Sequence, residues 1–414
     1  MRFQAPRGTE DILPSQIPAW QHLEQQFRQH TGTYGYGEIR TPTFEDVNLF
    51  VRTSGDTSDI VSKEIYQFTD KGGREIALKP ENTAPAMRAL IEHNLCPQGT
   101  VLRLCYVSTS LFRYDRPQKG RLREHHQFGI ELVGSPSSRA DAEVIEVAVR
   151  FFEKLGLTGL VARINSIGRA ECRVAYRDAL LSHVKGYLDG ASEEFREKVL
   201  KNPLRLLDSK DDGARAALVG APSILDYLEP DSATRFRELQ EHLTEAGITF
   251  EVAPDIVRGL DYYTDTVFEI QSDALGAQAT VCGGGRYDNL IKDIGGAALP
   301  SVGFGMGVER LLLVLEAAGK LPEPPVPTAF VAYSGEEKAA FSLVRALRAA
   351  GVVVLTDIDG KSLKSQLRQA DKSGARFVLL LGEEEVAAGT VTVKDMATGE
   401  QRAVTVDRVA EAIQ

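Results

Sequence analysis

The segment Arg258-Gly-Leu-Asp-Tyr-Tyr263 joins a permanent cation to a carboxylate and a pair of phenols. A guanidinium group stays charged at cellular pH, and its rigid fork of donors fits the oxygens of phosphates and carboxylates. These residue types suit a pocket that holds a small zwitterion beside a developing negative charge. A structural ion pair between Arg258 and Asp261 is the commoner use of so short a pattern, and it stays open as the alternative.

A basic segment lies between Arg113 and Arg123, where five Arg or Lys residues accompany a single Asp. Strands on both sides would hold Arg113 rigidly below a mobile loop tip. A fixed arginine beside a basic tip suits a triphosphate or the end of a nucleic acid. A solvated charged loop is the alternative interpretation.

Gly303, Gly305 and Gly307 alternate directly before Glu309 and Arg310. Alternating glycines remove the side chains from one face of a strand, so a flat ring could lie against the backbone. The spacing is neither that of a Rossmann fingerprint nor that of a P-loop. Arg310 would lie at the edge of the flat face, within reach of a phosphate.

Strands and helices with clear periodicity must position these groups. Apolar runs predict strands over 101–108, 128–133 and 251–257, the last of which ends directly before Arg258. Apolar residues at helical spacing predict helices over 17–31, 84–93 and 140–155. The segment from about 169 to 246 is mostly helical and charged, and we interpret it as an insertion.

Four prolines within residues 322–327 predict a stiff linker over 321–327. After the linker, strands over 329–333, 352–356 and 376–381 alternate with helices over 336–350 and 361–372. This order predicts an α/β domain with a mainly parallel sheet over 328–414. The residues before the linker, 1–320, would form the larger domain.

Composition limits the possible functions. The formal net charge of −10 argues against a protein that coats nucleic acid through overall charge. Local basic faces could still bind RNA, and Lys361, Lys364 and Arg368 belong to a basic stripe that continues to Lys372 and Arg376. A solvated helix face is the alternative. The chain has neither an apolar leader nor a run of membrane-spanning length, and its four scattered cysteines favour a reducing cytoplasm.

Several of these motifs together resemble those of a known enzyme class. Pro42 with the preceding residues 36–41, Phe112-Arg113-x-Asp115, and the glycine strand ending in Glu309-Arg310 resemble the three motifs of class II aminoacyl-tRNA synthetases. Arg258–Tyr263 and Gly284–Asp288 resemble the two histidine-binding motifs of histidyl-tRNA synthetases. The C-terminal domain is similar to the anticodon-binding domain of that family.

The resemblance implies an α+β catalytic domain with an antiparallel sheet of six to seven strands, helices and a helical insertion. It also implies L-histidine, ATP with Mg²⁺, and tRNA(His) as ligands, a homodimer, and no metal site built from protein side chains. The reaction would form histidyl-adenylate and pyrophosphate, and then transfer histidine to the 3′ end of the tRNA.

The resemblance further implies a role for individual residues. Histidine would be bound at its amino group by Glu81, Thr83 and Gln127, and at its imidazole by Glu131, Tyr263 and Tyr287. Arg113 would bridge the substrate carboxylate and the α-phosphate, and Arg258 would lie on the other side of the α-phosphate. The outer phosphates of ATP would be bound by Arg121 and Arg310. Contacts to tRNA would come from Gln118, Lys361, Lys364 and Arg368.

Four positions depart from the family pattern. Lys79, Asn82, Asp115 and His125 stand where the family usually has Arg, Gly, Glu and Phe. The last two would lie near the adenine of ATP, so we expect retuned ATP binding. The alternative function is the histidine-sensing regulatory subunit of ATP phosphoribosyltransferase, which typically lacks the C-terminal domain and has lost the phosphate-binding arginines; this chain retains both.

Overall fold

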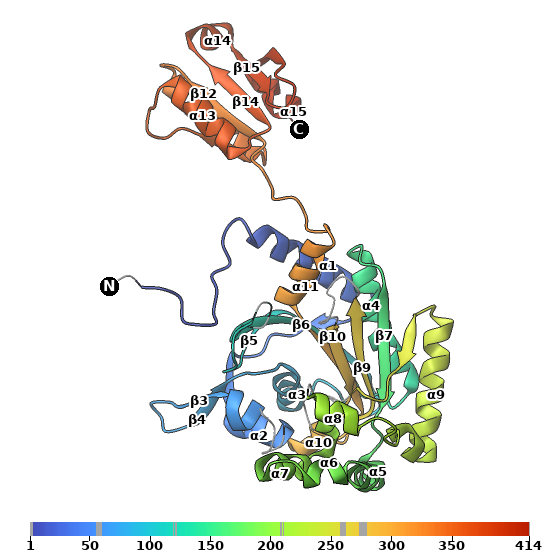
Figure 1. Cartoon of the computed structure of the whole chain (residues 1–414). Coiled ribbons are helices and arrows are strands. Elements are labelled where there is room, and N and C mark those ends of the chain that lie inside the picture. The colour runs from blue at the N-terminus through green and yellow to red at the C-terminus, as the bar shows by residue number, and fades with distance from the viewer. Residues whose placement is uncertain are drawn as a thin grey trace. The chain divides into compact units, whose positions relative to one another are not determined.

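The computed structural model of the chain describes residues 3–54, 60–118, 120, 122–207, 209, 211–256, 262–272 and 280–413 (Figure 1). The chain divides into two units, Met1–Pro322 and Glu323–Gln414. Among the described helices, none is both long enough and apolar enough to cross a membrane.

The first unit is built around an eight-stranded sheet in the order β1-β5-β6-β11-β10-β9-β7-β8. Its six inner strands are antiparallel: β5 (Leu102–Phe112), β6 (Glu124–Val133), β11 (Ser301–Gly307), β10 (Thr280–Arg286), β9 (Thr264–Ser272) and β7 (Leu160–Ser166). At the edges, β1 (Gly37–Glu38) and β8 (Phe250–Val252) pair in parallel with β5 and β7. These two short strands raise the number above the six to seven predicted.

The strand predicted over 251–257 is wrong in its extent. β8 ends at Val252, and the chain turns at Pro254 and Asp255. Proline has no N–H to donate to a ladder, so the apolar residues beyond it cannot continue the strand. Arg258 itself lies outside the described residues.

One face of the sheet is covered by α1 (Ile17–Thr33), α4 (Ser138–Lys154) and α11 (Val308–Ala317), with α9 (Pro230–Glu245) packed beside α4 (Figure 1). Their apolar stripes form the main core, where for example Phe27 stacks on Phe128 with ring centroids 4.8 Å apart. The last helix of the segment interpreted as an insertion, α9, therefore contributes to this core.

Strand alternation separates this core from the opposite face. Phe128, Ile130 and Leu132 of β6 point into the main core, so Gln127, Glu131 and Val133 face the other way. That side packs against α3 (Thr83–Glu92) and α10 (Leu290–Asp293). The same core includes the insertion helices α5 (Ala170–His183), α6 (Lys185–Asp189) and α7 (Glu193–Lys201). A further insertion helix, α8 (Asp212–Ala217), packs on α6. The candidate site residues on β6 and β10 thus lie between the sheet and these helices.

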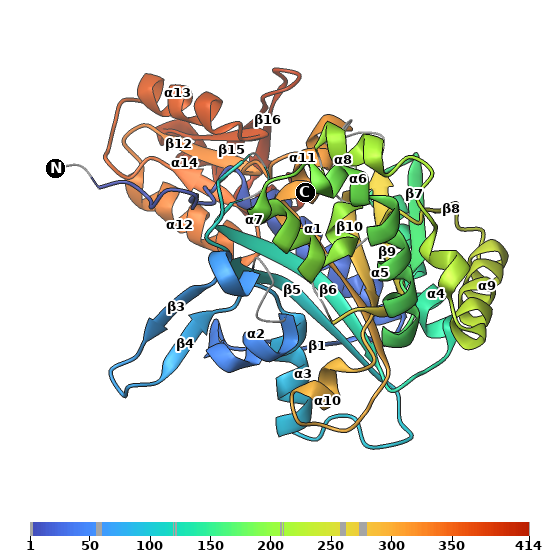
Figure 2. The same cartoon turned by 60° about the horizontal axis from the view of Figure 1, so that its bottom comes forward.

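A three-stranded sheet, β2 (Phe44–Asp46), β4 (Glu75–Leu78) and β3 (Tyr66–Thr69), follows β1 in the chain. Figure 2 shows β3 and β4 as a hairpin that projects from the first unit, next to α2 (Val47–Ser54). β4 leads directly into residues 79–83 and the start of α3.

The second unit contains a five-stranded sheet in the order β13-β12-β14-β15-β16. β12 (Ala329–Tyr333) pairs in parallel with β13 (Val354–Thr356) and β14 (Phe377–Leu381), as the alternating pattern predicted. β15 (Thr390–Asp395) and β16 (Gln401–Thr405) complete the sheet as an antiparallel hairpin that the sequence did not indicate. The helices are α12 (Glu337–Ala349), α13 (Leu363–Ser373), α14 (Glu383–Ala388) and α15 (Val409–Ala412).

Candidate active site

A buried carboxylate on β6 lies at the centre of the site. Glu131 Oε2 accepts a hydrogen bond from the hydroxyl of Tyr287, and Oε1 accepts one from Tyr106 at 3.4 Å. Burial raises the pKa of Glu131 to about 8, although donors such as Tyr287 partly offset the effect. The charged form of such a buried carboxylate is stabilised when a cation or a strong hydrogen-bond donor binds beside it.

A second buried carboxylate lies at the start of α3. Glu81 accepts hydrogen bonds from the backbone N–H of Thr83 at 2.6 Å and of Ala84 at 2.9 Å. N–H groups in the first turn of a helix have no partner within the helix, so Glu81 also stabilises the start of α3. Burial raises the pKa of Glu81, whereas the two N–H donors and the charge of Arg113 act in the opposite direction.

The two carboxylates belong to one cluster. The side chain of Thr83 lies close to both Glu81 and Glu131, where its single hydroxyl donor lowers the pKa of each against the larger effect of burial. The charge of Glu81 in turn raises the pKa of Glu131. Two buried acids joined by one threonine can bind a ligand that presents positive charge or N–H donors at two ends.

Buried tyrosines form the remaining wall. Tyr262 lies between Tyr263, at 4.7 Å, and Tyr287, at 5.6 Å between ring centroids. Tyr263 covers Gly285, where an added Cβ would come within 2.8 Å of the ring. Burial raises the pKa of Tyr262 and Tyr287 well above the usual value, so both remain phenols that can donate a hydrogen bond.

One tyrosine of this cluster was missed in the sequence. Tyr106 had no motif of its own, whereas Tyr262 is one of the two phenols of the segment Arg258–Tyr263, although no separate role was predicted for it. Gly129 was a possible signal for Tyr106, because it lies opposite Tyr106 on the neighbouring strand and a side chain there would overlap the Tyr106 ring. A glycine inside a strand indicates the close approach of another group.

The flat face predicted over the alternating glycines is largely occupied. An added Cβ on Gly303 would overlap the carboxylate of Glu131, and one on Gly305 would overlap the amide of Gln127. Only the position above Gly307 stays open, where the nearest atom would be Arg310 Cβ at 3.8 Å. Two of the three glycines therefore make room for binding side chains, and a flat ring could reach the backbone at Gly307.

The basic segment after β5 is fixed at its base. Arg113 Nε donates to the carbonyl of Pro80 at 2.9 Å, which brings the arginine next to Glu81. Arg310 lies in the first turn of α11, half-buried. The neighbouring Glu309 accepts from His126 Nδ1 at 2.8 Å and from its backbone N–H at 2.9 Å. Arg121 and Arg258 lie outside the described residues, and Gln118 is exposed.

Arg286 has a structural role within the motif-like segment 284–288. It is fully buried and forms an ion pair with Asp141 of α4 at 2.9 Å. It also donates to the carbonyls of Ser135 at 3.0 Å and Ser137 at 3.2 Å. These contacts tie β10 to α4, and they leave the neighbouring Tyr287 in a fixed position against Glu131.

The basic stripe of the C-terminal unit is shorter than predicted. α13 begins at Leu363, so Lys361 lies in the preceding loop, where it pairs with Asp359 at 2.7 Å. Lys364, Arg368 and Lys372 share the spacing of one helix face, and all three are exposed.

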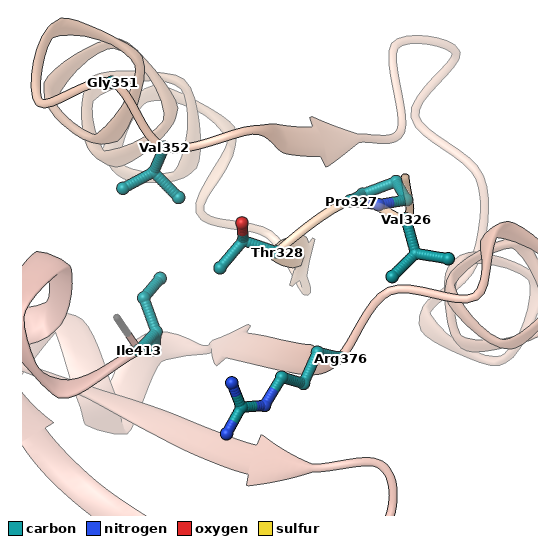
Figure 3. A pocket seen from close by; sticks show the side chains of 7 residues that line it. All are labelled: Val326, Pro327, Thr328, Gly351, Val352, Arg376 and Ile413. Carbon is teal, nitrogen blue, oxygen red and sulfur yellow. The ribbon is translucent and has the colours of Figure 1, made fainter. Parts of the chain in front are cut away.

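Arg376 lies beyond the helix and lines a separate pocket of about 310 Å³ (Figure 3). The other lining residues are apolar or small: Val326, Pro327, Thr328, Gly351, Val352 and Ile413. The pocket contains none of the residues of the candidate active site.

Comparisons with known proteins show the family to which the chain belongs. A model of the histidyl-tRNA synthetase family matches residues 8–311, and a model of an anticodon-binding domain matches residues 328–414. The histidine–tRNA ligases of Caldanaerobacter subterraneus subsp. tengcongensis and Thermoanaerobacter pseudethanolicus are each 48% identical over 417 residues, which cover 100% of both chains.

Solved structures show the same arrangement. Apo histidyl-tRNA synthetase from S. aureus has a TM-score of 0.83 and 32% identity, and the match covers 100% of each chain. A structure described as an ATP phosphoribosyltransferase regulatory subunit/histidyl-tRNA synthetase from Bacillus halodurans has a TM-score of 0.66 at 24% identity, covering 92% of this chain and 99% of that one. At this identity the second likeness shows the fold alone.

Proposed function

The chain belongs to the histidyl-tRNA synthetase family and is therefore a histidine–tRNA ligase, and we propose that the cluster around Thr83 binds its amino acid. The observation that supports this best is the pair of buried acids, Glu81 and Glu131, with the side chain of Thr83 close to both. Histidine is a ligand with a charged amino group at one end and, at the other, an imidazole that has an N–H donor and an acceptor nitrogen.

Each end of histidine has a matching set of groups. Glu81, Thr83 and Gln127 would accept from the α-amino group, while Glu131, Tyr263 and Tyr287 would bind the imidazole. Glu131 ionises more readily once the imidazole donates to it, because the new hydrogen bond offsets the cost of burying the charge. An analogue without these nitrogens would leave buried polar groups unpaired, so it should be rejected strongly.

Activation needs little acid–base chemistry. The histidine carboxylate would attack the α-phosphorus of ATP in line and expel pyrophosphate, while fixed cations stabilise the charge on the phosphoryl oxygens. We assign Arg113 and Arg258 to the α-phosphate, and Arg121 and Arg310 to the outer phosphates. Adenine would lie near Gly307, with Asp115 and His125 at its edge.

Mg²⁺ is proposed as the companion of ATP. The described residues contain no group of three His, Cys, Asp or Glu side chains that could hold a metal ion. Mg²⁺ bound with a nucleotide usually keeps several waters and is held by phosphate oxygens together with one or two carboxylates, so no such group is required. Bound there, it would neutralise charge on the phosphates that leave as pyrophosphate.

The second step would transfer histidine to the 3′ end of tRNA(His). Gln118 is proposed to contact the acceptor end, and the exposed residues Lys361, Lys364 and Arg368 are proposed to contact the tRNA from the C-terminal unit. Phosphate contacts of this kind explain how a chain with a net charge of −10 can bind RNA through a local face. We place this reaction in the cytoplasm, where tRNA is charged.

A homodimer is proposed from the region of Pro42. The small sheet that follows it exposes Phe44 and Phe68, at 54% and 46%. Their partners on β4, Leu78 and Ile76, are two residues apart, so both aromatic side chains lie on the same face. Sedimentation equilibrium at micromolar protein should give twice the chain mass; a monomer would contradict the proposal.

The proposed function is tested by histidine-dependent exchange between ATP and pyrophosphate, followed by aminoacylation of tRNA(His). Pure protein should catalyse both. The regulatory alternative predicts histidine binding without exchange. The chain retains the anticodon-binding domain over residues 328–414 that this alternative would lack, so the ligase is favoured.

A further inference from the structure

Lys79 and Asn82 flank Glu81 in the chain, and both are buried. Only 3% of Lys79 and 1% of Asn82 are exposed. A buried lysine usually pairs with a carboxylate, since removing an ammonium group from water is costly. Among the residues that the structure describes, no acidic side chain lies within ion-pair distance of Lys79; its partners are neutral oxygens.

These partners come from two segments. Lys79 Nζ donates to Thr41 Oγ1 at 3.0 Å, to the Thr41 carbonyl at 3.3 Å and to Asn82 Oδ1 at 3.2 Å. The hydroxyl of Thr41 in turn donates to Asn82 Oδ1 at 3.1 Å. An ammonium group is only a donor, so the oxygen of Asn82 must face Lys79. The Asn82 amide nitrogen then points away, buried and without a partner in the described structure.

The network holds the segment that presents Glu81. The backbone N–H of Lys79 donates to Thr43 at 3.0 Å, and its carbonyl accepts from Phe112 at 3.0 Å. The next carbonyl, that of Pro80, accepts from Arg113 at 2.9 Å. Residues 79–82 therefore connect the Thr41 segment, just before Pro42, with both Glu81 and Arg113.

We propose that Lys79 and Asn82 are positioning residues, which fasten the histidine-binding segment 79–83 to the Thr41 segment and so set the place of Glu81 and Arg113. This inference rests on the proposed role of Glu81 in binding histidine. It also accounts for the unusual pair of residues. The family usually has Arg and Gly at these positions, and Lys plus Asn supply a cation, amide donors and similar volume between them.

The Lys–Asn pair of this chain and the Arg–Gly pair usual in the family should respond differently to pH. Burial lowers the pKa of Lys79 to about 8, against the opposing charges of Glu45 and Glu81 that face it. Above this pH the ammonium loses a proton, and with it the charge that attracts the oxygens of Thr41 and Asn82. An arginine remains protonated throughout. Histidine binding by this chain should therefore weaken more on the alkaline side than binding by an Arg–Gly pair, for which only the loss of the ligand's own ammonium charge remains.

The test measures histidine affinity of the full chain by calorimetry, and the KM values for histidine and ATP in exchange, from pH 6.5 to 9.5. Three proteins are compared: native, Lys79→Met, and the double variant Lys79→Arg/Asn82→Gly. Lys79→Met should weaken histidine binding about 10- to 100-fold, as a displaced catalytic group does, with a smaller change in the KM for ATP. The double variant should bind histidine like the native protein at pH 7 and better than it at pH 9.

Three results would overturn the inference. One is a Lys79→Met variant that binds histidine as tightly as the native protein does. Another is an equal rise in the KM values for histidine and ATP that parallels a loss of thermal stability, since this would indicate general unfolding. Identical pH profiles for the native protein and the double variant would count equally against it, and this comparison holds even if Lys79→Met does not fold. A native protein that binds histidine but does not exchange would refute the ligase reaction alone, since calorimetry still judges the network.

Discussion

At the residue scale, burial decides how the acidic groups behave. Glu131 and Glu81 are both removed from water, which raises the pKa of each, and both retain several hydrogen-bond donors that oppose this effect. The tyrosines that surround them keep their protons and donate. The result is a cluster with hydrogen-bond acceptors at two ends and donors between them.

The charge on Glu131 should make folding dependent on pH. Its pKa is raised from 4.5 to about 8, so the folded protein binds more protons than the unfolded chain between these values. Stability therefore falls as pH rises through this window, by about 1.4 kcal/mol per pH unit. Glu131→Gln removes this titration and should also weaken histidine binding. As pH rises from 5 to 8, the native protein should lose stability relative to the Glu131→Gln variant.

Urea unfolding at several pH values measures this difference. Glu124→Gln, at the partly exposed start of the same strand, is the matched control. A difference between native protein and Glu131→Gln that stays constant with pH would show that Glu131 does not titrate in this window.

At the element scale, β11 is shaped by what its neighbour β6 presents. Gly303 pairs with Glu131, and Gly307 pairs with Gln127. The sequence pattern correctly indicated that a group approaches this strand closely, but it could not show that the group belongs to the protein. That information lies in the pairing of β6 with β11, which joins residues more than 150 positions apart and leaves no local trace.

Gly303→Ala should disturb the site, because its Cβ would overlap both the Glu131 carboxylate and the Ile130 carbonyl. We expect a loss of about 1–3 kcal/mol in the free energy of unfolding, typical of overpacking, together with weaker histidine binding. Gly307→Ala is the control: it has room for a methyl group, so its stability should stay within about 0.5 kcal/mol of native. Equal effects of the two substitutions on stability would contradict this account of the strand.

At the scale of the whole molecule, most of the long helices and buried strands were predicted correctly from the sequence. Helices α1, α3 and α4 and the parallel strands β12, β13 and β14 were predicted from apolar periodicity, because each buries one continuous face. The short edge strands were predicted poorly, since two or three residues hold no period: β1 was missed, and the strand at β8 was predicted to run too far. The prediction that Lys361 belongs to the helical basic stripe was wrong. Asp357 and Asp359 hold Lys361 in the loop before α13.

The division of labour between the two units gives a further prediction. Charge reversal of Lys364 and Arg368 to Glu should lower the rate of tRNA aminoacylation, because two phosphate contacts become repulsive, and should leave ATP–pyrophosphate exchange unchanged. Lys338→Glu on α12, also exposed, serves as a control for net charge. Equal losses in both assays, or an equal effect of the control, would argue against a tRNA-binding face on α13.

The central claim is that this chain activates histidine with ATP, and exchange of radiolabelled pyrophosphate into ATP tests it most directly. Native protein should catalyse exchange only when histidine is present. Arg113→Ala should be slower by about 10²–10³-fold, as expected when one fixed donor to a developing charge is removed, while Arg116→Ala in the same exposed segment should stay near native. Absence of histidine-dependent exchange in the native protein would contradict the account.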